Sequence, residues 1–206
     1  FFPLISLCSI FFVLTIIIKE WVGGTKSRMT SSMNPLTAFS KMIISNRGRN
    51  GGYIVHLAIL ALAFGVVGTK FYDQRIDTNI NISEEIAFKN YNILFENIDQ
   101  EITNGNSVTK AKFSVYDEEK KFIGKIEAMH SYYPNYNQIS VRSGILSNPI
   151  EDLYIIPKDF IDETNMTVRI AVNPLAWWIW ASGPILLIGT LITLWPSRQR
   201  KDKKWK

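Results

Sequence analysis

Three long apolar segments alternate with polar ones along the 206-residue chain. Residues 1–18, 51–69 and 173–196 contain no Asp, Glu, Lys or Arg. Each has about the length, roughly 20 residues, that an α-helix needs to cross a bilayer. We therefore predict a polytopic α-helical membrane protein with three spans. The segments between and after the spans are predicted to be a cytoplasmic loop at 19–50, an extracytoplasmic domain at 70–172 and a cytoplasmic tail at 197–206.

The long polar segment 70–172 has the pattern of short β-strands. Apolar and polar residues alternate in Lys112–Tyr116 and Phe122–Ala128, on either side of a charged turn, and this predicts a hairpin. A further turn is predicted at Asn104–Asn106. The other predicted strands are 78–82, 92–95 and 167–172. We expect a β-rich domain between the second and third spans, folded as a small barrel or sandwich.

The charge distribution predicts how the spans are oriented. The 19–50 loop and the 197–206 tail each contain six basic residues and one acidic residue, whereas 70–172 contains 11 basic and 16 acidic residues. Loops rich in Lys and Arg stay on the cytoplasmic side of a membrane. The overall net charge of +5 is therefore a topology signal and gives no indication of nucleic-acid binding.

Local patterns refine the ends of these segments. Residues 34–43 place apolar residues at helical spacing beside a basic face, which predicts either a helix lying in the membrane interface or a short packed connector helix. Asn173 and Pro174 predict the N-cap and first turn of the third span. The residues predicted to form aromatic belts at the two ends of that span are Trp177, Trp178, Trp180 and Trp195.

His56 is the side chain that most needs an explanation, because an ionisable group inside a membrane span is costly. Cys8 is a lone cysteine in the first span and is expected to be a small buried apolar residue. His130 lies in the 70–172 domain without a metal-ligand pattern around it, and we expect an ordinary strand-end or surface residue. The acidic pairs Glu84–Glu85 and Glu151–Asp152 fit a solvated face. The sequence of this domain contains no soluble catalytic constellation.

Three roles are open for His56 on these grounds. It could ligate a metal or haem iron, relay protons, or hydrogen-bond at a helix contact. A relay would need carboxylates at similar depth, and the three spans contain none. Arg47 and Arg49 could pair with haem propionates, although a topology signal explains both better. The small residues that would allow close approach of a helix or a flat macrocycle are Ala58, Ala61, Ala63, Gly65 and Gly68.

Separate stretches of the sequence, taken together, resemble the C-terminal part of the cytochrome c maturation protein family CcmF, the haem lyase subunits of the CcmF/NrfE type. These stretches are Asn46–Leu57, Arg142–Leu146 leading to Asp152–Ile155, and Asn173–Trp180 with Leu194–Pro196. They occur in the family's order, and the resemblance covers nearly the whole chain. The sequence begins at Phe1 without the pattern of a signal peptide, so we expect a piece of a larger protein.

The resemblance implies a subunit of the bacterial inner membrane that takes haem from the chaperone CcmE. It promotes covalent attachment of this haem to apocytochrome c, alongside maturation subunits such as CcmH. It also implies a transmembrane b-type haem held by two histidines, of which His56 matches the second. His56 is thus the predicted haem and metal ligand, and no catalytic residue is predicted. Membrane lipids are the remaining expected partners, and the acidic 70–172 domain could attract basic apocytochrome c.

The sequence also departs from the family. It has no second histidine in a span and no Trp-rich haem-handling loop, and Trp177–Ile179 lacks the aspartate of that loop's signature. We therefore do not expect a complete lyase. The rival interpretation is a membrane-tethered binding or scaffold module, in which the 70–172 domain docks a partner and His56 is structural. A transporter is less favoured, because the spans offer no polar path beyond His56.

Overall fold

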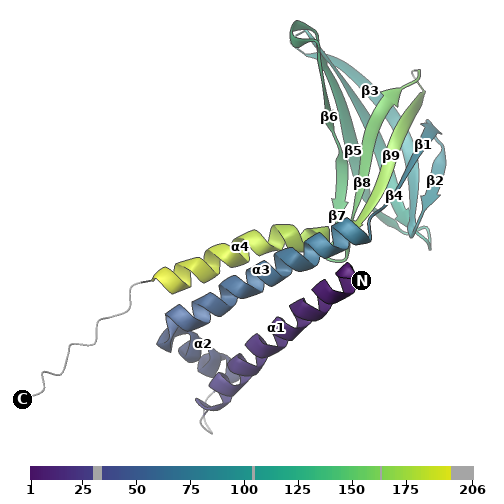
Figure 1. Ribbon diagram of the computed structural model, residues 1–206. Coiled ribbons are helices and arrows are strands. Elements are labelled where there is room, and N and C mark those ends of the chain that lie inside the picture. The colour runs from purple at the N-terminus through teal and green to yellow at the C-terminus, as the bar shows by residue number, and fades with distance from the viewer. Residues whose placement is uncertain (30–33, 104, 163, 196–206) are drawn as a thin grey trace, which may run out of the picture. The chain divides into compact units, whose positions relative to one another are not determined.

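The computed structural model describes residues 1–29, 34–103, 105–162 and 164–195, and it divides into a helical unit and a β unit (Figure 1). Among these residues, three helices are long and apolar enough to cross a membrane. They are α1 (Phe2–Lys26), α3 (Arg47–Phe71) and α4 (Ala176–Leu194), and the shorter α2 (Pro35–Ser45) lies between α1 and α3 in the chain. Within the described part of the chain, all nine strands fall between α3 and α4, which confirms the predicted fold class. Asn104 of the predicted turn and the 197–206 tail lie outside the described residues.

α1 extends well beyond the apolar segment that predicted it, because its last turns pack against α2. Trp21 and Phe39 make an edge-to-face ring contact at 5.6 Å between centroids. Met42 is buried, and its sulfur would lie 2.6 Å from a Cβ at Gly24. The Asn34 side chain caps α2 by accepting from the N–H of Leu36 at 3.1 Å. These contacts support the packed-connector interpretation of 34–43, and the interfacial interpretation stays a prediction.

α3 and α4 approach each other so closely that a side chain larger than hydrogen does not fit at the contact. A Cβ at Gly51 would lie 2.8 Å from the backbone nitrogen of Thr193, and a Cβ at Gly189 would lie 2.8 Å from the backbone nitrogen of Val55. Small residues at such a contact let the two backbones come into direct van der Waals contact, which is one of the attractions between helices in lipid.

The β unit consists of two antiparallel sheets. The strands of the first sheet, in spatial order, are β1 (Gln74–Asn81), β9 (Asn165–Pro174), β8 (Glu151–Phe160) and β7 (Gly144–Ser147). The strands of the second sheet, in spatial order, are β2 (Glu85–Phe88), β3 (Tyr91–Thr103), β4 (Asn106–Asp117), β5 (Phe122–Tyr133) and β6 (Gln138–Arg142). The predicted hairpin is confirmed, because β4 pairs with β5.

Both sheets contribute side chains to one shared core. Phe95 of β3 and Phe113 of β4 stack at 4.9 Å between ring centroids, and both are fully buried. Ile155 of β8 and Ile170 of β9 cover them from the other sheet. Burial of these alternate residues is the main stabilising contribution to the β unit, at about 25 cal/mol for each Å² of apolar surface.

The chain passes from the second sheet to the first at Gly144. β6 ends at Arg142 and β7 begins only two residues later. A Cβ at Gly144 would lie 2.8 Å from the carbonyl oxygen of Glu127 in β5 and would collide with Ile126. Glycine therefore allows β7 to start directly against β5.

The predicted cap of the third span is wrong. Asn173 and Pro174 continue β9 and pair with Asp152 and Glu151 of β8. β9 ends at Pro174, and the next residue, Leu175, has a φ of 62° and donates its N–H to the carbonyl oxygen of Ile150 at 2.7 Å. Pairing with a distant strand thus overrides the local Asn-Pro signal, and α4 begins at Ala176.

Substitution of Gly189 by Val should loosen the contact between α3 and α4, because the new side chain would overlap the backbone of α3. We expect the variant to lose about 1–3 kcal/mol of stability in detergent. The matched control is Gly183→Val in the same helix, since a Cβ at Gly183 meets no atom within 4 Å. Thermal unfolding of the full chain compares the two variants, and equal losses would contradict the described contact.

Candidate functional site

His56 lies on an open face of α3. Its side chain is exposed, and none of the residues in the described part of the chain hydrogen-bonds or ion-pairs with it. The buried residues of the helix are Asn50, Gly51, Ala58, Ala61, Gly65, Val67 and Gly68. With 3.6 residues per turn, most of these fall on the side of α3 opposite His56. The imidazole therefore points away from the contacts that α3 makes with the rest of its unit.

Most of the small residues of α3 serve helix packing. Ala58, Ala61 and Gly65 are on the buried side, and a Cβ at Gly68 would lie 2.7 Å from the Cβ of Leu175. Ala58, Ala61 and Gly65 accordingly support the first of the two uses proposed for them, the close approach of another helix, whereas Gly68 meets Leu175 just before α4 begins. They do not line the same face as His56.

The face around His56 is apolar and has room beside it. Gly52 lies one turn before His56, and a Cβ there would meet no atom within 4 Å. Ile59 lies nearly one turn after it and is 50% exposed. An accessible imidazole on an apolar surface with space next to it fits one side of a haem site, in which the macrocycle needs apolar contact and the iron needs an axial nitrogen.

The residues that precede His56 fix the start of α3. Asn50 is buried and donates from Nδ2 to the carbonyl oxygen of Met42 at 2.9 Å, which satisfies a carbonyl group in the last turn of α2. Gly51 makes the contact with α4. Arg47 is half-buried and Arg49 is exposed. This stretch therefore joins α2, α3 and α4 just before the helix reaches His56.

An aromatic cluster links the three long helices further along α3. Phe64 makes edge-to-face contacts with Phe11 of α1 at 6.4 Å and with Trp178 of α4 at 6.1 Å between ring centroids. Trp178 thus has a packing role, whereas Trp177 and Trp180 are exposed. The belt role of these tryptophans stays a prediction.

His130 lies within β5 and not at a strand end. It sits opposite Thr109 of β4 and Val141 of β6. Its ring is half-buried and makes an edge-to-face contact with Phe160 at 5.5 Å between centroids. Within the part of the chain that the structure describes, no three His, Cys, Asp or Glu side chains gather as metal ligands.

Asp152 contradicts the expectation that the Glu151–Asp152 pair forms a solvated face. Its side chain is 0% exposed, and neither carboxyl oxygen meets a hydrogen-bond donor in good geometry among the described residues. Burial raises the pKa of the Asp152 carboxyl, and the neighbouring Ser147 and Tyr154 oppose this shift without cancelling it. Sequence reasoning missed this residue because its burial depends on pairing with Asn173 of β9. The sequence offered one sign that Asp152 differs from an ordinary surface acid, namely that it begins the stretch Asp152–Ile155 that resembles the CcmF family.

A polar group of side chains lies next to Asp152. Lys89 and Glu151 form an ion pair at 3.9 Å, and Asn148 donates from Nδ2 to the Tyr91 hydroxyl at 3.4 Å. Burial and the adjacent Glu151 carboxylate raise the pKa of Tyr91 to about 12. Tyr91 therefore stays protonated at neutral pH and acts here as a hydrogen-bonding residue.

Replacement of Asp152 by Asn should change how stability depends on pH. Because burial raises the folded-state pKa of Asp152, this carboxyl contributes stability at low pH that is lost as the pH rises through the raised pKa. At neutral pH, the free energy of unfolding of Asp152→Asn should therefore exceed that of the wild type by on the order of 1 kcal/mol. The variant should accordingly unfold at a higher temperature. The advantage should vanish in acid.

The matched control for this prediction is Asp159→Asn, an exposed carboxylate in the same strand. We expect no pH-dependent difference for it. Thermal unfolding of the full chain, followed by the circular dichroism of its strands at several pH values, checks both variants. An Asp152→Asn variant less stable than wild type at neutral pH would contradict the described burial.

No protein-family model matches the chain. It is similar to the probable cytochrome c-type biogenesis protein NrfE of Escherichia coli, with 24% identity over 149 residues that cover 72% of this chain and 27% of NrfE. It is 23% identical over 155 residues to the cytochrome c-type biogenesis protein CcmF of Pseudomonas aeruginosa, covering 75% of this chain and 23% of CcmF. The chain thus spans about a quarter of the length of the curated relatives it matches.

The fold is shared with a solved structure of a cytochrome c haem lyase CcmF. The two superpose with a TM-score of 0.62 over 89% of this chain and 34% of the CcmF chain, at 16% sequence identity. At this identity the likeness establishes a common fold. The curated sequence matches and the common fold together confirm the resemblance of this chain to the CcmF/NrfE-type cytochrome c biogenesis proteins.

Proposed function

We propose that the chain is the C-terminal part of a cytochrome c-type biogenesis haem lyase subunit, and that His56 is one axial ligand of a transmembrane b-type haem. The proposal is supported most directly by the position of His56 on a face of α3 that α1 and α4 leave open. A structural histidine at a helix contact would be expected on the packed side of α3, paired with a hydroxyl or amide group.

The residues of this chain would supply half of the haem site. His56 would offer a neutral imidazole nitrogen on a helix that is fixed at its start by Asn50 and Gly51. Because these contacts hold α3, the helix that carries His56 is positioned before haem binds, which lowers the cost of binding. The bound haem would supply one-electron redox chemistry. The second axial histidine would come from a segment outside this chain.

The location and the partners that we propose are those that the resemblance to the CcmF/NrfE-type proteins implies. The subunit would lie in the bacterial inner membrane with the β unit on the extracytoplasmic side, and would receive haem from CcmE and act on apocytochrome c together with subunits such as CcmH. The β unit would provide a docking surface for one of these partners. Its anchoring to the chain at both ends, through α3 and α4, is compatible with this role.

Substitution of His56 by Ala should abolish the Soret absorbance of the purified full-length protein that contains this chain. The expected loss is nearly complete, because an iron left with one axial protein bond binds far more weakly. The matched control is His130→Ala, which removes the other histidine of the chain from β5 and should leave the spectrum unchanged.

The same pair of variants separates the proposal from the rival scaffold interpretation. An unchanged haem spectrum in His56→Ala, with partner capture by the β unit retained, would overturn the ligand assignment and favour the scaffold. Loss of haem in both variants would indicate general destabilisation. In that case His56→Met, which keeps a possible iron ligand, should restore haem with a shifted spectrum only if residue 56 contacts the iron.

The acidic surface of the β unit offers a second test, directed at apocytochrome c. Several carboxylates are held in ion pairs, including Asp77 with Arg169 and Asp99 with Lys112. Glu118 and Glu119, in the turn between β4 and β5, are exposed and form no ion pair among the described residues. These two are therefore available to attract a basic partner.

Neutralisation of this turn by the double substitution Glu118→Gln and Glu119→Gln should slow association with a basic apocytochrome c several-fold at low salt. At about 1 M salt the Debye length falls to roughly 3 Å and the difference should disappear. The control neutralises Lys120 and Lys121 of the same turn and should not slow association. Stopped-flow binding at two salt concentrations measures the effect, and equal slowing at both would contradict an electrostatic origin.

A further inference from the structure

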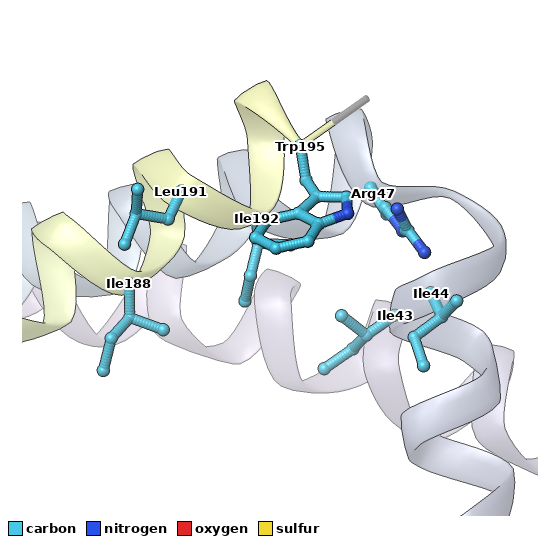
Figure 2. Close-up of a pocket in the computed structure, with 7 residues that line it drawn as sticks. All are labelled: Ile43, Ile44, Arg47, Ile188, Leu191, Ile192 and Trp195. Carbon is cyan, nitrogen blue, oxygen red and sulfur yellow. The ribbon is translucent and has the colours of Figure 1, made fainter. Parts of the chain in front are cut away.

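We propose that a groove between α2, α3 and α4 binds one anionic phospholipid. The groove has a volume of about 480 Å³, which is within the range of small-molecule sites. Its apolar walls are formed by Ile43 and Ile44 of α2 and by Ile188, Leu191 and Ile192 of α4 (Figure 2). Arg47 and Trp195 complete the lining.

The one charged residue of the lining lies at one end of the groove. Figure 2 shows Arg47 at the same end as Ile43 and Ile44, and Ile188 at the other end. Ile188 and Trp195 are seven residues apart on or just beyond α4, which corresponds to about two helical turns or roughly 10 Å. An acyl chain could lie along this stripe, with its headgroup beside Arg47.

The fold explains why the chain's own side chains do not fill the groove. Gly51 and Gly189 bring α4 against α3, whereas α2 leaves α3 at Asn46, whose φ of −140° and ψ of 68° are not helical. The space between α2 and the end of α4 consequently stays open. Its walls are exposed, with 58% of Ile44 and 53% of Leu191 accessible. Beside a helix long and apolar enough to cross a membrane, such an apolar surface suits a lipid acyl chain.

Charge complementarity indicates that the lipid bound in the groove is anionic. A guanidinium has five donors and binds phosphate in a planar, bidentate manner, so Arg47 can hold a phosphate in addition to its contacts within the chain. α3 begins at Arg47, and the amides of a helix N-terminus favour an anion at the same place. The 19–50 segment, which includes α2 and the start of α3, has six basic residues and one acidic residue, which favours a headgroup with net negative charge.

The lipid site is separate from the His56 face. His56 does not line the groove, and lipid binding there would not depend on haem. The proposal therefore stands independently of the proposed function. A neutral lipid would gain the apolar contacts of the groove but would leave the surplus of positive charge uncompensated.

Native mass spectrometry of the full chain, released from membranes that contain equal amounts of phosphatidylglycerol and phosphatidylcholine with matched acyl chains, tests the site. We expect one retained phosphatidylglycerol and preference over phosphatidylcholine. Arg47→Gln should reduce this retention about tenfold, since a hydrogen bond to a charged group is among the stronger polar contacts. Arg49→Gln, the exposed neighbouring arginine, is the matched control and should retain the lipid.

A second pair of variants tests the apolar part of the groove. Ile188→Trp should fill the groove and expel the lipid, whereas Leu187→Trp places the same side chain at a position that is 61% exposed and outside the lining. Equal retention of the two phospholipids, or equal effects of Arg47→Gln and Arg49→Gln, would overturn the proposal. If Arg47→Gln does not fold, the comparison of Ile188→Trp with Leu187→Trp tests the proposal by itself. Equal lipid retention in these two variants would then overturn the proposal.

Discussion

Gly51 and Gly189 allow the backbones of α3 and α4 to meet without an intervening side chain. In lipid, where burial of apolar surface gives helices little reason to associate, this contact area is a principal source of attraction. The contact also determines which sides of α3 are covered by other helices. One side of the helix is occupied by α4, and the Phe11–Phe64 contact assigns another side to α1. His56 is left on the remaining side. The same contact also shapes the groove beside α2, because it holds α4 against α3.

The sequence stretches that carry the family resemblance acquire distinct physical roles in the structure. In the first stretch, Asn50 and Gly51 join three helices. In the second, Gly144 lets the chain change sheets. The third ends β9 beside Asp152, so that stretches distant in sequence meet at one end of the β unit. Most of these residues are explained by packing. His56 stands apart, because no contact within the described residues accounts for it.

Sequence patterns were sufficient for the features that depend on local periodicity. Uncharged segments of about 20 residues identified the three long helices, and alternation on both sides of residues 117–121 identified the β4–β5 hairpin. The errors arose where a distant partner decides the conformation. Asn173 and Pro174 have a helix-start signal but pair with β8, and Asp152 resembles a surface acid but is buried by β9. The open face of α3 is likewise invisible in sequence, because it depends on where α1 and α4 pack.

The two neighbouring glycines at the start of α3 differ in their steric requirements. Gly51 cannot accept a side chain without displacing α4, whereas a Cβ at Gly52 would meet nothing in this chain. Gly52 is one helical turn from His56, on the same face. A methyl group at position 52 should therefore leave the fold intact and reduce only the space available to a molecule lying against that face. Gly52 thus reports on the size of whatever covers His56, independently of how that molecule is bound.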